Sequence, residues 1–175
     1  MLRAATLGDE TAFARLWREV HPPLLRYLRV LAGNAAEDVA SEVWLEVARR
    51  LPRFWGGEQE FRGWLFTLAR RRVTDMRRHE SRRPVRLTDD PEHLDRPGAD
   101  DTATAALDNL STEAALALIA SLPREQAEVI VLRVVAGLDV GRVARIVGKR
   151  PGTVRVAAHR GLRALAAQLG QRVTT

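Results

Sequence analysis

Apolar residues recur at intervals of three and four along nearly all of the chain outside residues 85–110. This spacing is the period of an α-helix, and no stretch keeps the strict alternation of a β-strand. The predicted helical segments are 13–20, a second apolar run at 24–31 after Pro22–Pro23, 35–51, 61–83, 114–120, 123–136, a short helix that ends near Gly148, and 153–169. The pattern therefore predicts an all-α fold.

Charge divides the chain into three parts. The 175 residues hold 28 Lys and Arg against 22 Asp and Glu, which gives a net charge of +6. Residues 1–84 carry a net +5, residues 85–110 carry −5 with several Pro and Gly, and residues 111–175 carry +6. We therefore predict two small basic helical domains, 1–84 and 111–175, joined by a flexible acidic linker. A basic surface favours a nucleic-acid partner.

The C-terminal segment is predicted to form two helices joined by a tight connection at residues 149–152. The second helix carries an apolar stripe, which is formed by Val154, Ala158, Leu162, Leu165 and Leu169. A separate face of the same helix carries Arg155, Val156, His159, Arg160 and Arg163. A helix-turn-helix places its second helix in the major groove of DNA, where such a face meets base edges and phosphates. A solvated helical hairpin is the alternative interpretation.

The N-terminal domain ends in a second basic cluster, with seven Arg between residues 70 and 83. Aromatic residues precede it, and Trp55 lies beside Gly56–Gly57 in a predicted loop. Basic surfaces with exposed rings suit single-stranded DNA, because bases stack on the rings while Arg follows the backbone. Trp64 and Phe66 are better explained as core residues, and a solvated helix face is the alternative for the Arg cluster.

Composition and motifs argue against several other classes. The chain has no Cys, and its first residues lack the apolar run of a signal peptide. No segment is apolar enough to span a bilayer, so we expect a cytoplasmic protein without membrane insertion. The pairs His79–Glu80 and Glu92–His93 do not form a catalytic or metal-binding pattern. We expect no catalytic residues, no metal and no cofactor.

Taken together, the segments resemble an extracytoplasmic-function (ECF) RNA polymerase sigma factor of the sigma-70 family. The motifs are "AEDVASEVWLEV", "FRGWLFTLARRRVTDMRR" and "LPREQAEVIVLRVVAGLDVGRVARIVGKRPGTVRVAAHRGLRAL", in that order. The resemblance implies a bundle like sigma domain two at residues 1–84, a linker at 85–110, and a helix-turn-helix like sigma domain four at 111–175. It implies binding to core RNA polymerase at the β′ clamp helices and β flap, recognition of promoter −10 and −35 elements, and assistance in strand opening.

The resemblance assigns site residues by position. Core polymerase is expected to contact Asp38, Glu42, Trp44 and Leu45. The −10 element and the melted strand are expected to meet Trp55, Phe61, Trp64, Arg70, Arg71, Arg72, Asp75, Arg77 and Arg78. The −35 element is expected to meet Arg142, Arg145, Lys149, Thr153, Arg155, Val156, His159, Arg160 and Arg163. Double- and single-stranded promoter DNA and an anti-sigma factor are the further expected partners, and the free chain is expected to be a monomer.

Three positions depart from the family pattern and bear on specificity. Arg71 stands where members often have Asn, which favours backbone contact over base readout. Arg150 replaces a common Ser helix cap, and Val156 replaces a frequently polar position. A Val there removes a hydrogen bond and favours contact with a thymine methyl group.

Two other functions remain open from the sequence. A helix-turn-helix regulator that acts without polymerase would explain residues 123–169 but not the N-terminal Arg cluster. A protein that only sequesters a partner would not need two basic faces. A regulator would bind a palindrome unaided, whereas a sigma factor would need polymerase.

Overall fold

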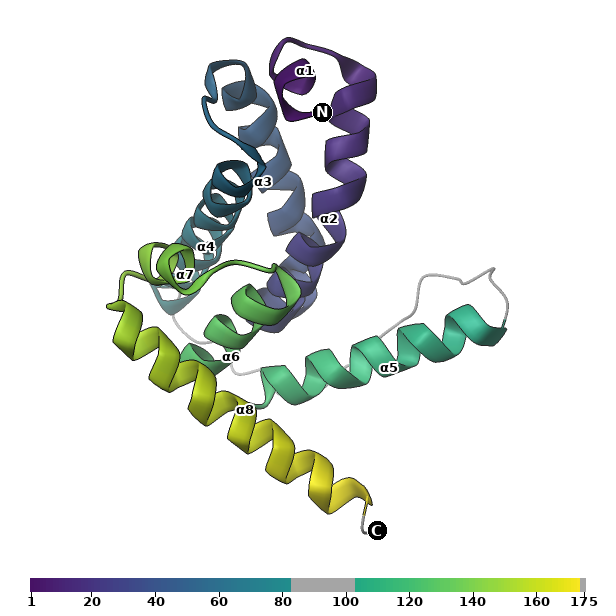
Figure 1. Ribbon diagram of the computed structural model, residues 1–175, viewed down its shortest axis with the longest axis vertical. Coiled ribbons are helices and arrows are strands. Elements are labelled where there is room, and N and C mark those ends of the chain that lie inside the picture. Colours follow the sequence, from purple (N-terminus) through teal and green to yellow (C-terminus); the bar gives the residue numbers. More distant parts are fainter. Residues whose placement is uncertain (83–102, 174–175) are drawn as a thin grey trace.

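The computed structural model describes residues 1–82 and 103–173, and the regular elements in these ranges are all helical (Figure 1). The α-helices are α1 (Leu2–Thr6), α2 (Glu10–Ala32), α3 (Ala36–Arg50), α4 (Glu58–Arg82), α5 (Ala103–Ala120), α6 (Arg124–Ile130), α7 (Val140–Val147) and α8 (Pro151–Val173). Short 3₁₀ turns at Gly33–Ala35 and Leu51–Arg53 connect the first long helices. The prediction of an all-α fold is confirmed.

Helices α2, α3 and α4 pack around an apolar core, and α1 lies against α2. The side chains of Tyr27, Phe61 and Phe66 are among the largest that this core encloses completely. The Tyr27 and Phe66 rings meet edge to face, with centroids 5.3 Å apart. Burying such rings is the main stabilising term for helices of this length.

Helix α2 continues through Pro22 and Pro23, although the pattern indicated two separate apolar runs. Each Pro removes the hydrogen bond to the carbonyl group four residues earlier. Those carbonyl groups belong to Arg18 and Glu19, which are exposed, so water can donate hydrogen bonds to them. Burial of apolar residues on both sides of the prolines holds the helix together.

In the C-terminal half, α6 runs into a π-helical turn at Val131–Val135, and α7 follows after Gly137. The Asp139 carboxylate caps α7 by accepting from the Arg142 backbone N–H at 2.8 Å. Helix α8 packs across α6 and α7. Gly161 permits this approach, because a Cβ there would lie 3.0 Å from Cγ1 of Ile130.

The two halves contact one another directly. Helix α2 packs against α5, α6 and the π-helical turn, and α4 packs against α7. Figure 1 shows α6 and α7 beside the lower ends of α2 and α4, while α5 extends away from them. Buried residues of both halves form one continuous apolar cluster.

The structure adds detail to two sequence predictions about this region. Helix α5 begins at Ala103, so the last eight residues of the predicted linker are helical. The Ala-rich composition there explains the early start. Residues 85–102 of the linker lie outside the described residues. On α8 the buried face is Val154, Ala157 and Gly161, whereas Leu162 and Leu169 are about half exposed.

Candidate DNA and polymerase interface

Helices α7 and α8 form a helix-turn-helix with a backbone-defined turn. Gly148 ends α7 in the left-handed conformation, with φ 68° and ψ 35°, where a Cβ would be strained. The Lys149 N–H then donates to the Ala144 carbonyl oxygen at 3.0 Å. Pro151 begins α8, because its fixed φ suits a first helical residue and that position needs no N–H. The turn therefore fixes α8 relative to α7.

The basic face predicted on α8 points away from the core. All six residues of this face are exposed: Thr153, Arg155, Val156, His159, Arg160 and Arg163. Val156 is 50% exposed and is the apolar member of this face. Within the described ranges, no carboxylate pairs with Arg155, Arg160 or Arg163. These guanidinium groups are free to meet an anionic partner.

The basic residues near the turn between α7 and α8 differ in whether they form ion pairs. Arg142 pairs with Asp139, the residue that caps α7, and at 2.9 Å with Glu60 of α4. The Asp139 carboxylate and then that of Glu60 raise the pKa of Arg142. Lys149 lies 3.5 Å from Glu125, whereas Arg145 is exposed and pairs with no acid in the described part of the chain. Arg142 therefore joins the two halves in this conformation.

The loop before α4 presents one ring to solvent. Trp55 is 95% exposed and borders a hollow of about 740 Å³ that is also lined by Leu2 of α1 and by Leu7, the residue after α1. Phe61 has no exposed surface, so the expectation that it contacts DNA does not fit this structure. Trp64 is half-buried, with its ring 5.1 Å from that of Phe54. Trp55 is thus the exposed member of this aromatic set.

Farther along α4, the basic residues divide into exposed and engaged groups. Arg71 and Arg78 are exposed, and Arg71 lies 3.9 Å from Asp75 one turn away. Arg77 donates to the Leu31 carbonyl oxygen at the end of α2. The exposed guanidinium groups remain accessible to a phosphate backbone.

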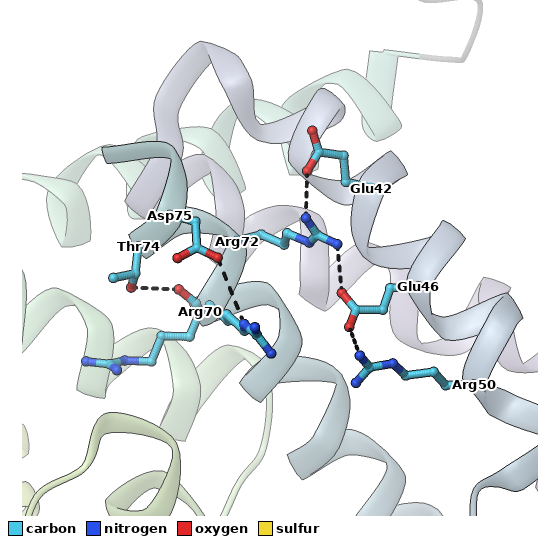
Figure 2. A network of polar contacts seen from close by, with 8 residues as sticks. Glu42, Glu46, Arg50, Arg70, Arg72, Thr74 and Asp75 are labelled. Atoms are coloured by element: carbon cyan, nitrogen blue, oxygen red, sulfur yellow. Dashed lines mark hydrogen bonds and ion pairs between the residues drawn. The ribbon is translucent and has the colours of Figure 1, made fainter. Parts of the chain in front are cut away.

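Arg72 ties α4 to the acidic residues of α3 (Figure 2). Its guanidinium group lies 2.9 Å from Oε2 of Glu46 and 3.6 Å from Oε2 of Glu42. The second oxygen of Glu46 accepts Arg50 at 3.0 Å, so this buried carboxylate is paired on both oxygens. The segments predicted to meet −10 DNA and polymerase are therefore linked by ion pairs.

Arg70 is engaged with the other half of the chain. Its Nε donates to Oε1 of Glu128 on α6 at 2.8 Å, and the Tyr27 hydroxyl donates to the same oxygen at 3.1 Å. Glu128 is only 7% exposed, and Tyr27 is fully buried. Burial, together with the Glu128 carboxylate, raises the pKa of Tyr27 well above its usual value. This bridge spans the contact between α2, α4 and α6.

The segment predicted to contact polymerase presents one outward face. Asp38, Glu42 and Leu45 recur at helical spacing and are exposed, with Leu45 at 58%. Trp44 instead turns toward α2, where its Nε1–H donates to Nδ1 of His21 at 3.1 Å. Three of the four predicted residues thus share a surface, and Trp44 supports it from the side.

Sequence reasoning missed the residues that join the elements. Glu128 lies in an otherwise apolar run, and a charge in such a run is the signal that could have drawn attention to it. Tyr27, Glu60 and His21 carried no comparable signal, because their partners lie far away in sequence. Tyr27 and Glu128, for example, are separated by 101 residues along the chain.

Comparison with known families identifies both halves of the chain. Residues 16–83 match Sigma-70 region 2, and residues 112–165 match Sigma-70 region 4. These are the two regions with which a sigma factor binds RNA polymerase and promoter DNA. The class of protein is therefore a sigma-70 type transcription initiation factor.

Curated relatives define the group more closely. The chain is 36% identical to the ECF RNA polymerase sigma factor ShbA of Streptomyces griseus, over 96% of this chain and 94% of ShbA. It is 32% identical to SigD of Mycobacterium tuberculosis, over 92% of this chain and 78% of SigD. The chain belongs to the ECF RNA polymerase sigma factors.

Solved structures share the fold. One is CnrH in complex with the cytosolic domain of CnrY, with a TM-score of 0.64 and 20% identity over 97% of this chain and 95% of that one. Another is RpoE of Bartonella quintana in complex with the anti-sigma factor NepR, with a TM-score of 0.65 and 21% identity over 91% and 97%. These structures show the fold, and the matches to Sigma-70 regions 2 and 4 and to the curated relatives confirm the identification predicted from the sequence.

As an alternative sigma factor, the chain directs RNA polymerase to promoters. A regulator that acts without polymerase is not favoured, because both sigma regions are present in order. In the described part of the chain, every helix is too short or too polar to cross a membrane.

Proposed function

We propose that the exposed basic face of α8 reads the −35 element. The observation that carries this proposal is that Arg155, Arg160 and Arg163 stand on one exposed face without an acidic partner among the described residues. His159 and Thr153 extend the face, and Val156 suits a thymine methyl group. Arg145 and Lys149 contact phosphates near the turn and fix the register of the helix on the duplex.

The −10 element meets the exposed side of α4 and the loop before it. Trp55 offers a stacking surface for an unpaired base, since its ring is 95% exposed beside the hollow against α1. Arg71 and Arg78 track the phosphate backbone, and Asp75 orients Arg71 across one helical turn. Trp64 supports this surface from within.

Three arginines that the sequence predicts to contact DNA are paired with carboxylates in this structure. Arg70 is bound to Glu128, Arg72 to Glu46, and Arg142 to Glu60. The first and third of these pairs join the two halves of the chain. Separation of the halves on core polymerase would free Arg70 and Arg142 for DNA, whereas Arg72 would keep its partner within the N-terminal half.

Core polymerase docks on the outward face of α3, which Asp38, Glu42 and Leu45 form. An exposed Leu flanked by carboxylates suits a helical partner with an apolar stripe and basic margins, as expected of the β′ clamp helices. The C-terminal half contacts the β flap. The chain itself carries out no catalysis and needs no metal or cofactor; polymerase supplies the chemistry.

The chain is a cytoplasmic monomer when free, and an anti-sigma factor is its further partner. Cytoplasmic location follows from its polymerase partner. An anti-sigma partner is supported by CnrH and RpoE, the similar folds, which were solved with CnrY and the anti-sigma factor NepR. We keep the domain limits 1–84, 85–110 and 111–175 as our proposal for how the chain divides, with residues 103–110 of the connecting segment forming the first part of α5.

Run-off transcription tests the whole proposal. Core RNA polymerase is supplied with genomic promoter fragments, with and without this protein, and transcripts are mapped to their start sites. We expect defined transcripts only with the protein. Arg160→Ala should lower the transcript yield by roughly 5- to 150-fold, since a bidentate base contact contributes about 1–3 kcal/mol. Arg26→Ala, an exposed Arg on α2, is the matched control. Protection of a palindrome by the protein alone, without transcripts, would contradict the proposal.

A further inference from the structure

A histidine lies between two tryptophans where α2 meets α3. The His21 ring stacks on Trp17 with centroids 4.3 Å apart and an interplanar angle of 14°. On another side, Trp44 of α3 donates its Nε1–H to His21 Nδ1 at 3.1 Å. Phe13 closes the cluster, with its ring edge-on to Trp44 at 5.9 Å.

This hydrogen bond fixes the protonation state of His21. The indole N–H can only donate, so Nδ1 of His21 must carry a free lone pair and the ring proton must sit on Nε2. His21 is therefore neutral in this structure. Protonation of Nδ1 would place two N–H donors against one another and break the bond.

The cluster adjoins the proposed polymerase-docking face. Trp44 directly precedes Leu45, which is 58% exposed on that face, and Trp17 is 39% exposed beside it. Trp44 points toward α2, so its hydrogen bond to His21 restricts the rotation of α3 about the helix axis. A second polar link, between Arg29 and Glu37 at 3.5 Å, is exposed at both ends.

We propose that His21 is a positioning residue for polymerase binding, and that its neutral ring holds Trp44 and thereby the outward face of α3 in the docking arrangement. Protonated His21 releases Trp44 and weakens docking. The inference rests on the proposed role of the α3 face.

The charges around His21 set the direction of its titration. Burial lowers the pKa of His21 below 6.5, Glu37 on α3 raises it, and Arg29 on α2 lowers it. The face of Trp17 attracts a cation and partly offsets burial. Because the folded-state pKa is depressed, the stabilisation is complete above about pH 6.5 and is lost as the pH falls through the folded-state pKa.

Nuclear magnetic resonance of the indole groups tests the pairing without polymerase. The chain has four Trp, so Trp→Phe variants assign the Nε1–H signals. We expect the Trp44 signal to shift in one transition between pH 7.5 and 5.0. His21→Asn supplies an amide oxygen in place of Nδ1 and does not titrate, so its Trp44 signal should stay constant. A wild-type Trp44 signal that does not move, with the fold intact by circular dichroism, would overturn the proposal.

Polymerase affinity tests the functional consequence. Fluorescence anisotropy of the labelled chain measures binding to core polymerase at pH 7.5 and 5.5. We expect wild type to lose roughly fivefold in affinity on acidification, as for loss of one hydrogen bond. His21→Ala should bind more weakly than wild type at both pH values. His21→Asn should restore binding at pH 7.5 and should not show the loss of affinity that wild type shows at pH 5.5. His79→Asn, at an exposed His on α4, should keep the wild-type profile.

The outcomes separate the inference from the function on which it rests. Equal pH dependence in wild type and His21→Asn would overturn the role of His21 while leaving the docking face in place. Absence of wild-type binding at pH 7.5 would contradict the proposed function itself.

Discussion

Replacement of Glu128 by Ala tests how the two halves are held together. The carboxylate is 7% exposed and accepts hydrogen bonds from Tyr27 and Arg70, both in the N-terminal half. Its removal leaves the buried Tyr27 hydroxyl without this acceptor. It also leaves Arg70 without its counter-ion at the contact between the halves.

The expected loss in the free energy of unfolding is about 3 kcal/mol. Removal of one partner from a buried ion pair costs roughly 3–5 kcal/mol. The lower end applies because the Arg70 side chain is 36% exposed, so water can solvate it. Glu128→Gln keeps an oxygen for Tyr27 but loses the charge, and it should cost about 1 kcal/mol.

Urea unfolding and small-angle X-ray scattering measure the two consequences. Glu128→Ala should unfold at lower urea and show a larger radius of gyration, because the halves separate more often. Glu113→Gln, at an exposed Glu on α5, is the matched control. A double-mutant cycle with Tyr27→Phe should show coupling of about 1 kcal/mol. Wild-type stability and compactness in Glu128→Ala would refute the reasoning.

Three further measurements address particular contacts. Tyr27 is the single Tyr of the chain and its pKa is raised, so the folded state keeps the proton that the unfolded state releases near pH 10. The free energy of unfolding should therefore fall as the pH rises above about 10, with tyrosinate absorbance appearing only on unfolding. Tyr27→Phe should lose less stability over that pH range. Asp9→Ala should lower the free energy of unfolding by about 1 kcal/mol in urea, since Asp9 caps α2 through the Ala12 N–H at 2.9 Å, whereas Asp9→Asn should stay within a few tenths. Gly161→Leu should lower the free energy of unfolding by about 1–3 kcal/mol in urea, because the Leu side chain would collide with α6. Gly152→Ala on the same helix places its methyl group in open space and should leave the free energy of unfolding unchanged. Wild-type stability in Gly161→Leu would contradict the observed packing.

Local features of the sequence predicted much of the fold. The helical period, the stop at Gly148 and the basic face of α8 depend on neighbours a few residues apart, so they can be read directly from the chain. Trp55 was singled out because it lies beside Gly56–Gly57, and it is the exposed ring of its region. The order of the three motifs was sufficient to identify the sigma factor family.

Exposure of apolar residues was harder to predict. Phe61 and Leu162 both fit an apolar pattern, yet Phe61 has no exposed surface and Leu162 is 52% exposed. Periodicity identifies a face of a helix but not how much of it a neighbouring helix covers. That depends on crossing angle and on close approach at positions such as Gly161.

The sequence by itself determined that this protein is an all-α sigma factor with two basic regions and placed its arginines on particular helices. Only the tertiary structure decided which arginines are free. Arg70 pairs with an acid 58 residues away, Arg72 with one 26 away and Arg142 with one 82 away, whereas Arg155 and Arg160 face solvent. Helical period is a property of neighbouring residues along the chain. Ion pairing depends on distance in space, which packing of the two halves sets.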